Sequence, residues 1–187
     1  MLSGKNIVLG VSGGIAAYKA ADIINRLRAL GANVDVIMTK NALQFITPLT
    51  LASLSRNRVV TDMFELPASW EIEHISLARK ADLFLIAPAT ANVIGKIANG
   101  IADDMLTTTV MATKAPVVIA PAMNDYMYEN PIVQENISRL RKLGYKFVEP
   151  EEGYLACGTT GKGKLARPET IVEYVANVLA GRDDGTL

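Results

Sequence analysis

The stretch NIVLGVSGGIAAYKAADIINRLRALGANVDVIM, residues 6–38, decides the fold. Residues 6–10 are an apolar run that predicts a buried strand, and residues 15–30 repeat apolar side chains at helical spacing. Gly31 follows, as glycine commonly does after a helix, and residues 33–38 predict a second strand. A strand, a helix and a strand within about 30 residues form a βαβ unit, whose two strands run parallel.

The same alternation continues along the chain and predicts a Rossmann-like α/β fold, with a doubly wound parallel sheet in three α/β/α layers. Apart from the first unit, we expect strands at 58–62, 82–87, 117–120 and 145–148, and a glycine-rich loop at 153–164. Further helices are expected at 41–55 with an interruption at Pro48, 74–80, 90–99, 103–113, 131–143 and 168–180.

The composition excludes several classes of protein. The 187 residues carry 19 basic and 19 acidic side chains, which gives no electrostatic reason to expect nucleic acid or an anionic membrane as a partner. No apolar run approaches the roughly 20 residues of a transmembrane helix. A single cysteine excludes an internal disulfide and fits a reducing cytoplasm, and a single histidine excludes a His-rich metal cluster, so no metal is expected.

The first two strand ends suggest a phosphate site. The first strand leads into GVSGGIAA, residues 10–17, where glycines allow a phosphate to approach the backbone at the start of a helix. The spacing is not that of the dinucleotide fingerprint GxGxxG. The second strand ends in Thr39 and Lys40 without an acid for a ribose hydroxyl, which favours a mononucleotide phosphate. The alternative is a glycine turn that only packs helix against strand.

Two later strands end in the same tripeptide, Ala-Pro-Ala, at 87–89 and 120–122. Proline cannot donate to a sheet ladder, so we expect each strand to stop there and, after Pro121, a loop that carries Met123, Asn124, Tyr126 and Met127. Small side chains after the first proline would allow a flat ring to lie against the backbone, with Thr90 and Asn92 bonding its polar edge or capping a helix. After the second, Asn124 offers a substrate an uncharged amide, although Asn and Asp are also common in turns.

The single histidine and the single cysteine each allow two interpretations. His74 follows Glu71 and Glu73, but a lone histidine is more often structural than catalytic. Cys157 lies in LACGTTGKGKL, residues 155–165, a glycine-rich stretch of the kind that forms lids. A free cysteine is usually a small buried hydrophobe, whereas on a lid it is better interpreted as an acid or a nucleophile.

Together these motifs resemble the homo-oligomeric flavin-containing cysteine decarboxylases, in order and over nearly the whole chain. Members of that family often have Trp where Tyr128 stands here. The segments that carry the resemblance are GVSGGIAAYK at 10–19, His74-Ile75, PATAN at 88–92, PAMNDYMY at 121–128 and ACGTTGKGK at 156–164.

Within the family, the resemblance is to the branch that acts on 4′-phosphopantothenoylcysteine and releases 4′-phosphopantetheine in coenzyme A biosynthesis. It implies FMN as cofactor, a trimer or dodecamer of this chain with flavin sites between subunits, and a small-molecule substrate. The implied chemistry oxidises the cysteine thiol to a thioaldehyde, which accepts the electrons left by departing CO2. The resulting enethiol is then reduced again, so there is no net oxidation.

The resemblance also implies roles for individual residues. His74 would be the base near the thiol and carboxylate, Asn124 would bind the carboxylate and Cys157 would donate the final proton. Substrate contacts besides Asn124 are expected from Met127, Ala156, Arg79 and Lys162. The residues expected to bind FMN are Ser12, Gly13, Gly14, Ile15, Thr39, Ala89, Thr90, Asn92 and Thr107.

Four other functions remain open. A flavin prenyltransferase would need basic residues for a prenyl phosphate, and a peptidyl-cysteine decarboxylase would lack the Ala-Cys-Gly lid. A non-catalytic flavoprotein regulatory subunit tends to carry a long acidic tail, and a plain nucleotide-binding domain would not be yellow. We expect residues 1–181 to form the flavin-binding domain. Residues 182–187 would be a flexible tail, the start of a linker to a missing ligase domain.

Overall fold

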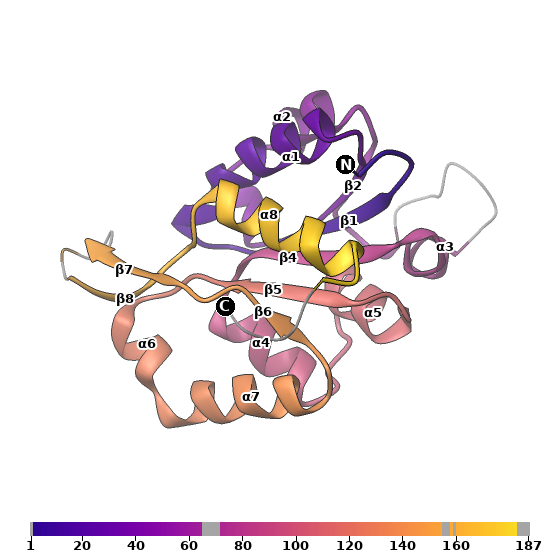
Figure 1. The fold of residues 1–187 in the computed structure, drawn as a ribbon. Coiled ribbons are helices and arrows are strands. Elements are labelled where there is room, and N and C mark those ends of the chain that lie inside the picture. Colours follow the sequence, from indigo (N-terminus) through magenta and orange to yellow (C-terminus); the bar gives the residue numbers. More distant parts are fainter. Residues whose placement is uncertain (1, 65–71, 155–157, 159, 183–187) are drawn as a thin grey trace.

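The computed structural model describes residues 2–64, 72–154, 158 and 160–182. Six parallel strands form the central sheet in the order β3-β2-β1-β4-β5-β6, which is the Rossmann order (Figure 1). A separate antiparallel hairpin, β7–β8, extends from one end of the molecule. The strands are β1 (Asn6–Val11), β2 (Asn33–Met38), β3 (Val59–Val60), β4 (Leu83–Ala89), β5 (Val117–Pro121), β6 (Lys146–Phe147), β7 (Glu151–Tyr154) and β8 (Thr160–Lys164).

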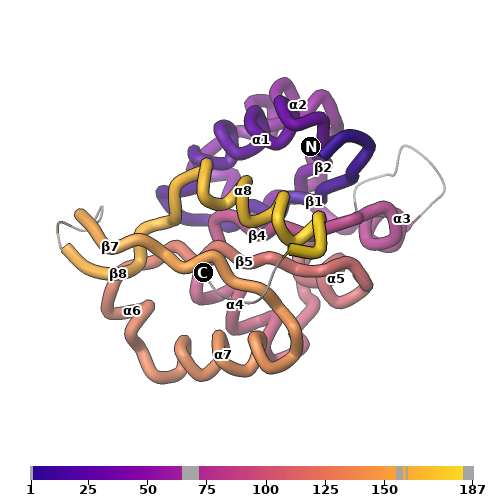
Figure 2. Tube along the Cα trace, viewed as in Figure 1, coloured from indigo at the N-terminus to yellow at the C-terminus, as the bar shows by residue number. Residues whose placement is uncertain are grey.

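Helices cover both faces of the sheet, which gives the expected three layers (Figure 2). Helices α1, α2 and α8 pack on the face that carries Leu9 and Leu85, whereas α3, α4, α5 and α7 pack on the face that carries Phe84 and Ile119. The helices are η1 (Ile15–Lys19), α1 (Ala20–Ala29), η2 (Ala42–Gln44), α2 (Pro48–Ser55), α3 (Glu73–Lys80), α4 (Ala91–Ala98), α5 (Met105–Ala112), α6 (Asp125–Glu129), α7 (Pro131–Lys142) and α8 (Pro168–Leu179).

The predicted α/β/α fold is confirmed, and each predicted strand and helix is present with small shifts of its ends. Within the part of the chain that the structure describes, no helix is long and apolar enough to span a bilayer. The same residues bring no three His, Cys, Asp or Glu side chains together as a metal site. Of the expected tail at 182–187, only residue 182 is described.

Three local predictions are wrong. The strand that was expected to stop before Pro88 runs through it to Ala89, because the ladder shifts register between Ile86 and Ala89 and leaves the proline at the irregularity. The segment after Pro121 is not only a loop, since α6 begins at Asp125. The expected glycine-rich loop at 153–164 contains most of the hairpin β7–β8.

The sheet's apolar centre predicts a contrast between two leucines. Leu85 on β4 is fully buried, so Leu85→Ala should lower the free energy of unfolding by about 2–5 kcal/mol through lost contacts and a cavity. Leu143 after α7 is 65% exposed, and Leu143→Ala should change it by about 0.5 kcal/mol or less. Urea denaturation followed by circular dichroism measures both, and equal losses would contradict this account of the core.

Candidate functional site

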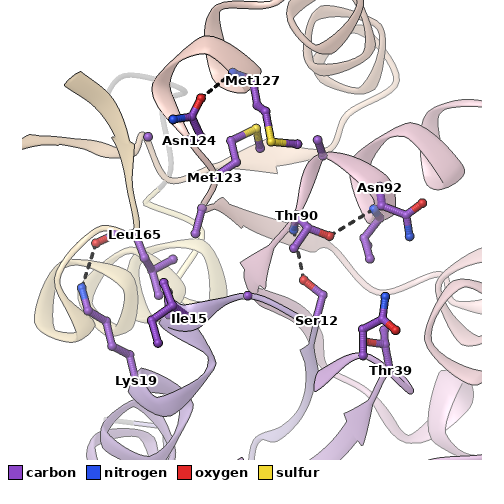
Figure 3. Close-up of a pocket in the computed structure, with 18 of the residues that line it drawn as sticks. Ser12, Ile15, Lys19, Thr39, Thr90, Asn92, Met123, Asn124, Met127 and Leu165 are labelled. Carbon is purple, nitrogen blue, oxygen red and sulfur yellow. Dashed lines mark hydrogen bonds between the residues drawn. The ribbon is translucent and has the colours of Figure 1, made fainter. Parts of the chain in front are cut away.

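A cavity of about 740 Å³ opens at the carboxyl ends of β1, β2, β4 and β5 (Figure 3). Its wall is built mainly from five segments, residues 12–16, 39–41, 90–93, 122–124 and 163–165. Open α/β sheets bind their ligands at this edge, where the strand order reverses between β1 and β4. The cavity is therefore the candidate functional site, and the strand-end motifs meet in it.

Ser12 joins the ends of β1 and β4 at the floor of the cavity. Its buried hydroxyl donates to the carbonyl oxygen of Pro88 (2.7 Å) and accepts from the backbone N–H of Thr90 (3.0 Å). The Ser12 N–H also donates to the Pro88 carbonyl (3.3 Å). This hydroxyl therefore holds two loops together, and Ser12 lines the cavity with its side chain already hydrogen-bonded.

Gly13 lets the loop after β1 touch the loop after β2. A Cβ on Gly13 would lie 2.4 Å from Cβ of Asn41 and 2.7 Å from its carbonyl carbon, closer than such atoms can approach. Gly14 is different, because the nearest atom to a Cβ there is Cγ2 of Thr90 at 3.7 Å. The first glycine is thus required by packing, and the second leaves room beside the cavity.

Polar groups at this side of the cavity suit an anion. Thr90 caps α4, its Oγ1 accepting from the N–H of Val93 (3.5 Å), so the positive end of the α4 dipole lies at the cavity wall. Asn92 is exposed on the first turn of α4, and Thr39 and Lys40 approach from the end of β2. Thr90 is therefore a helix cap that also lines the cavity.

Asn124 likewise serves the fold and lines the cavity. Its Oδ1 accepts from the N–H of Met127 (3.4 Å), which makes Asn124 the N-cap of the short helix α6. The preceding Met123 N–H donates to the carbonyl oxygen of Gly163 on β8 (3.0 Å). The loop that presents the amide is therefore attached directly to the hairpin.

The glycines of β8 allow this attachment. A Cβ on Gly163 would lie 2.4 Å from the carbonyl oxygen of Met123, and one on Gly161 would lie 2.6 Å from Cβ of Asp125. Side chains alternate along a strand, so Lys162, which lies between these glycines, points to the other side. The two glycines thus leave β8 without side chains where Met123 and Asp125 lie against it.

A carboxylate fixes the far side of the hairpin. Glu149 Oε2 accepts from the hydroxyl of Tyr128 (3.0 Å) and from Nζ of Lys162 (3.0 Å), and its Oε1 pairs with Arg141. Burial alone would raise the pKa of Glu149, but the Lys162 hydrogen bond and the Arg141 charge outweigh it, so this pKa is lowered. Burial and the charge of Glu149 raise the pKa of Tyr128 to about 12.

Most of the predicted site residues come together in the cavity. Those that line it are Ser12, Gly13, Gly14, Ile15, Thr39, Thr90, Asn92, Asn124 and Met127.

Two residues predicted to contact the cofactor lie behind the cavity wall. Ala89 is fully buried in β4, and Thr107 is fully buried in the first turn of α5. The Thr107 hydroxyl donates to Oδ1 of Asp104 (2.8 Å), and its backbone N–H donates to the same oxygen (2.8 Å). Thr107 therefore forms a capping box with Asp104 that supports the cavity wall. Of these two residues, Asp104 lines the cavity.

Three other predicted residues lie away from the cavity of this chain. His74 and Arg79 are on α3, which packs on α5 and lies at the opposite end of the sheet from α6 and the hairpin (Figure 1). Lys162 is exposed and paired with Glu149. Ala156 and Cys157 lie outside the described residues.

Sequence reasoning missed three lysines in the cavity wall, Lys19, Lys96 and Lys164. Lys19 was visible only as part of the motif at 10–19. Lys164 was not predicted because its segment was expected to be a loop, in which side chains do not alternate between two faces. Even if residues 160–164 had been predicted as a strand, period-two alternation would not have separated Lys164, in the cavity wall, from Lys162, which pairs with Glu149.

The tight contact at Gly13 predicts different effects of alanine at adjacent glycines. Gly13→Ala should lower the free energy of unfolding by about 1–3 kcal/mol, because backbone atoms of Asn41 must move. Gly14→Ala should be tolerated, since its Cβ meets only an ordinary contact. Urea denaturation of the two variants measures this, and equal stability would show that the two loops do not touch as described.

The Glu149 cluster predicts a dependence of stability on pH. Because its pKa is lowered in the fold, Glu149 stabilises the native state above its unfolded pKa, and this contribution is lost as pH falls through the folded pKa. Glu149→Gln should therefore be less stable than the parent chain at neutral pH, with the difference shrinking below about pH 4. Glu152→Gln, at an exposed position of β7, is the control. A deficit that persists unchanged in acid would contradict this assignment.

The chain is similar to proteins of coenzyme A biosynthesis. It is 58% identical over 92% of its length to the coenzyme A biosynthesis bifunctional protein CoaBC of Bacillus subtilis, of which it covers 43%. The chain thus spans under half the length of that relative. It is 49% identical over 94% of its length to a probable phosphopantothenoylcysteine decarboxylase of Streptococcus mutans, of which it covers 99%.

A solved structure agrees with these relatives. A PPC decarboxylase variant complexed with pantothenoylaminoethenethiol superposes with a TM-score of 0.82 at 31% identity, covering 94% of this chain and 98% of the other. Residues 1–180 match the Flavoprotein family, which is nearly the whole chain. The chain belongs to the Flavoprotein family.

Proposed function

We propose that this chain is an FMN-dependent decarboxylase that converts 4′-phosphopantothenoylcysteine to 4′-phosphopantetheine. The observation that carries the proposal is the cavity, where the glycine loop, the α4 N-terminus and the Asn124 loop of the family motifs meet. It is supported by the relative named as a probable phosphopantothenoylcysteine decarboxylase and by the bifunctional protein of coenzyme A biosynthesis, each similar to this chain over more than 90% of its length. A cytoplasmic location fits such a role.

The residues present fit a flavin mononucleotide. The close approach at Gly13 and the open space beside Gly14 leave backbone exposed to a ligand next to Thr39, Lys40 and the start of α4. These groups would hold a phosphate. Small and apolar side chains that line the cavity, among them Ala91, suit a flat ring. Bound there, the flavin supplies reversible two-electron oxidation of the substrate thiol.

Asn124 would hold the substrate carboxylate through its side-chain amide. A neutral donor suits a group that leaves as uncharged CO2, because a full cation would stabilise the carboxylate more than the transition state. The cap hydrogen bond to the Met127 N–H uses Oδ1 and so orients the amide nitrogen as the donor. Met127 lines the same wall and would shape the pocket around the thiol.

His74 would act in the cavity of a neighbouring copy. Its position on α3 keeps it out of the cavity of its own chain, so the base requires self-association, as a trimer or a dodecamer. Exposed Phe64 and Ile72 lie near the start of α3 in sequence and supply apolar surface for such a contact. Cys157 would donate the final proton from the segment between β7 and β8.

The direct test is incubation of the purified FMN-loaded protein with 4′-phosphopantothenoylcysteine. Mass spectrometry should show loss of CO2 and formation of 4′-phosphopantetheine. A yellow, folded protein that leaves this substrate intact would refute the proposed reaction but not the flavin site.

If the site is shared between copies of the chain, two inactive variants should complement one another. His74→Asn and Asn124→Asp should each abolish most activity as homo-oligomers, the second through repulsion between like charges. Co-expressed, they should regain measurable activity, because some cavities of a mixed oligomer receive both parental side chains. Co-expression of His74→Asn with the double variant, which carries both His74→Asn and Asn124→Asp, should give no activity. Mass spectrometry shows whether the oligomers are mixed. If mixed oligomers regain no activity, His74 either takes no part in the mechanism or acts in the cavity of its own chain.

A further inference from the structure

Asp35 is a buried carboxylate that the cavity does not use. It lies in the middle of β2 and is 8% exposed, and it is not among the residues that line the cavity. Its neighbours Val34 and Val36 belong to the core under α1, α2 and α8. Because side chains alternate along a strand, Asp35 faces the other layer together with Ile37, on the side of α3 and α5. A charge inside an apolar layer is destabilising unless it has a partner.

The partner of this carboxylate is Lys80, the last residue of α3. Lys80 Nζ lies 2.7 Å from Asp35 Oδ2, and Oδ2 has no other partner among the residues that the structure describes. If α3 moved away, the lysine could be solvated, but the carboxylate would remain buried without a compensating charge. The ion pair therefore fixes the C-terminal end of α3 against β2.

Helix α3 depends on polar contacts because its apolar packing is small. It has eight residues, of which Leu77 and Ala78 are buried. The Thr113 hydroxyl, after α5, donates to the carbonyl oxygen of Ala78 (3.0 Å), which secures the same end of the helix as Lys80. Two polar contacts thus hold the last turn of α3 from two neighbouring elements.

A second ion pair lies at the start of α3, next to His74. The Glu73 carboxylate is 3.7 Å from the guanidinium of Arg58, which precedes β3. The Glu73 side chain is 28% exposed, against 11% for that of Asp35, so solvent screens this longer pair more strongly. The start of α3 is therefore held less firmly by charge than its end.

We propose that Asp35 and Lys80 are positioning residues for His74, which they hold in place by anchoring α3 to β2. The inference rests on the proposed function, in which His74 acts in the cavity of a neighbouring copy, and adds two residues to it. His74 lies six residues before Lys80, about 9 Å along the helix axis. A tilt of α3 at its anchored end would therefore displace the imidazole, and a displacement of about 1 Å can lower a reaction rate about a hundredfold.

The first test measures the kinetics of Asp35→Asn and Lys80→Gln with 4′-phosphopantothenoylcysteine. In both variants kcat should fall about tenfold or more, while KM and the affinity for FMN stay close to the parent values, because neither residue lines the cavity. Lys80→Arg keeps the charge and should retain most activity. The matched control is Asp22→Asn, which removes a carboxylate that pairs with Arg26 (3.0 Å) on α1 and should leave kcat unchanged. If Lys80→Gln does not fold, Asp35→Asn decides, and a parental kcat in that variant would overturn the proposal.

Co-expression separates a positioning role from a general loss of structure. A chain with a displaced α3 should fail only as the donor of His74. Where His74→Asn and Asn124→Asp complement one another, Asp35→Asn should therefore gain activity with Asn124→Asp and gain none with His74→Asn. Recovery with neither variant would assign Asp35 to folding, and recovery with His74→Asn would place the defect in the chain's own cavity. Either result would overturn the proposal.

Hydrogen exchange of the FMN-loaded protein, followed by mass spectrometry, tests the anchor without the reaction. Asp35→Asn should speed the exchange of α3 amides about tenfold or more and leave those of α1 unchanged. Parental exchange of α3 in this variant would overturn the proposal. Failure of the parent chain to release CO2 would overturn the proposed function, and failure of His74→Asn to complement Asn124→Asp would overturn the shared site. In both cases the exchange of α3 alone decides whether Asp35 anchors the helix.

Discussion

The site depends on one buried hydroxyl that joins two central strands where both end. Ser12 Oγ donates to Pro88 and accepts from the Thr90 N–H, so the loops after β1 and β4 are held at one spacing. A buried hydroxyl that lost either bond would incur a desolvation cost of about 1–3 kcal/mol, which makes the arrangement stiff. Helix α4 starts directly after Thr90, so the hydrogen bond between Ser12 and Thr90 also sets the direction of the α4 dipole.

Around this floor of the cavity, glycines, which carry no side chain, let backbone segments come into contact. Gly13 brings in the loop after β2, and Gly163 brings in the hairpin, whose carbonyl accepts the Met123 N–H. The Asn124 loop is consequently held between the sheet and β8. Glu149 anchors the outer side of the same hairpin through Lys162, and it also accepts a hydrogen bond from the hydroxyl of Tyr128. The geometry of the wall thus comes mainly from backbone contacts.

Local patterns were sufficient for the sheet and for most of the cavity. Apolar runs separated by amphipathic helices fix a parallel order, and parallel strands place their carboxyl ends, with residues such as Thr39, Thr90 and Asn124, at one edge. Contacts between distant segments were not predictable in this way. Glycines that indicate a loop in isolation form a strand in β8, because Met123 and Asp125 lie directly against it. The distance of α3 from the cavity, and hence the isolation of His74 within one chain, also depends on tertiary packing.

The role of the Ser12 hydroxyl is measured most directly by the affinity of the Ser12→Ala protein for FMN. Without the hydroxyl, the Thr90 N–H and the Pro88 carbonyl lose their shared partner and the floor should loosen. The dissociation constant for FMN, measured by fluorescence quenching of the flavin, should rise by about tenfold or more, while circular dichroism shows the sheet still folded. An affinity equal to that of the parent chain would contradict the claim that this hydroxyl organises the site.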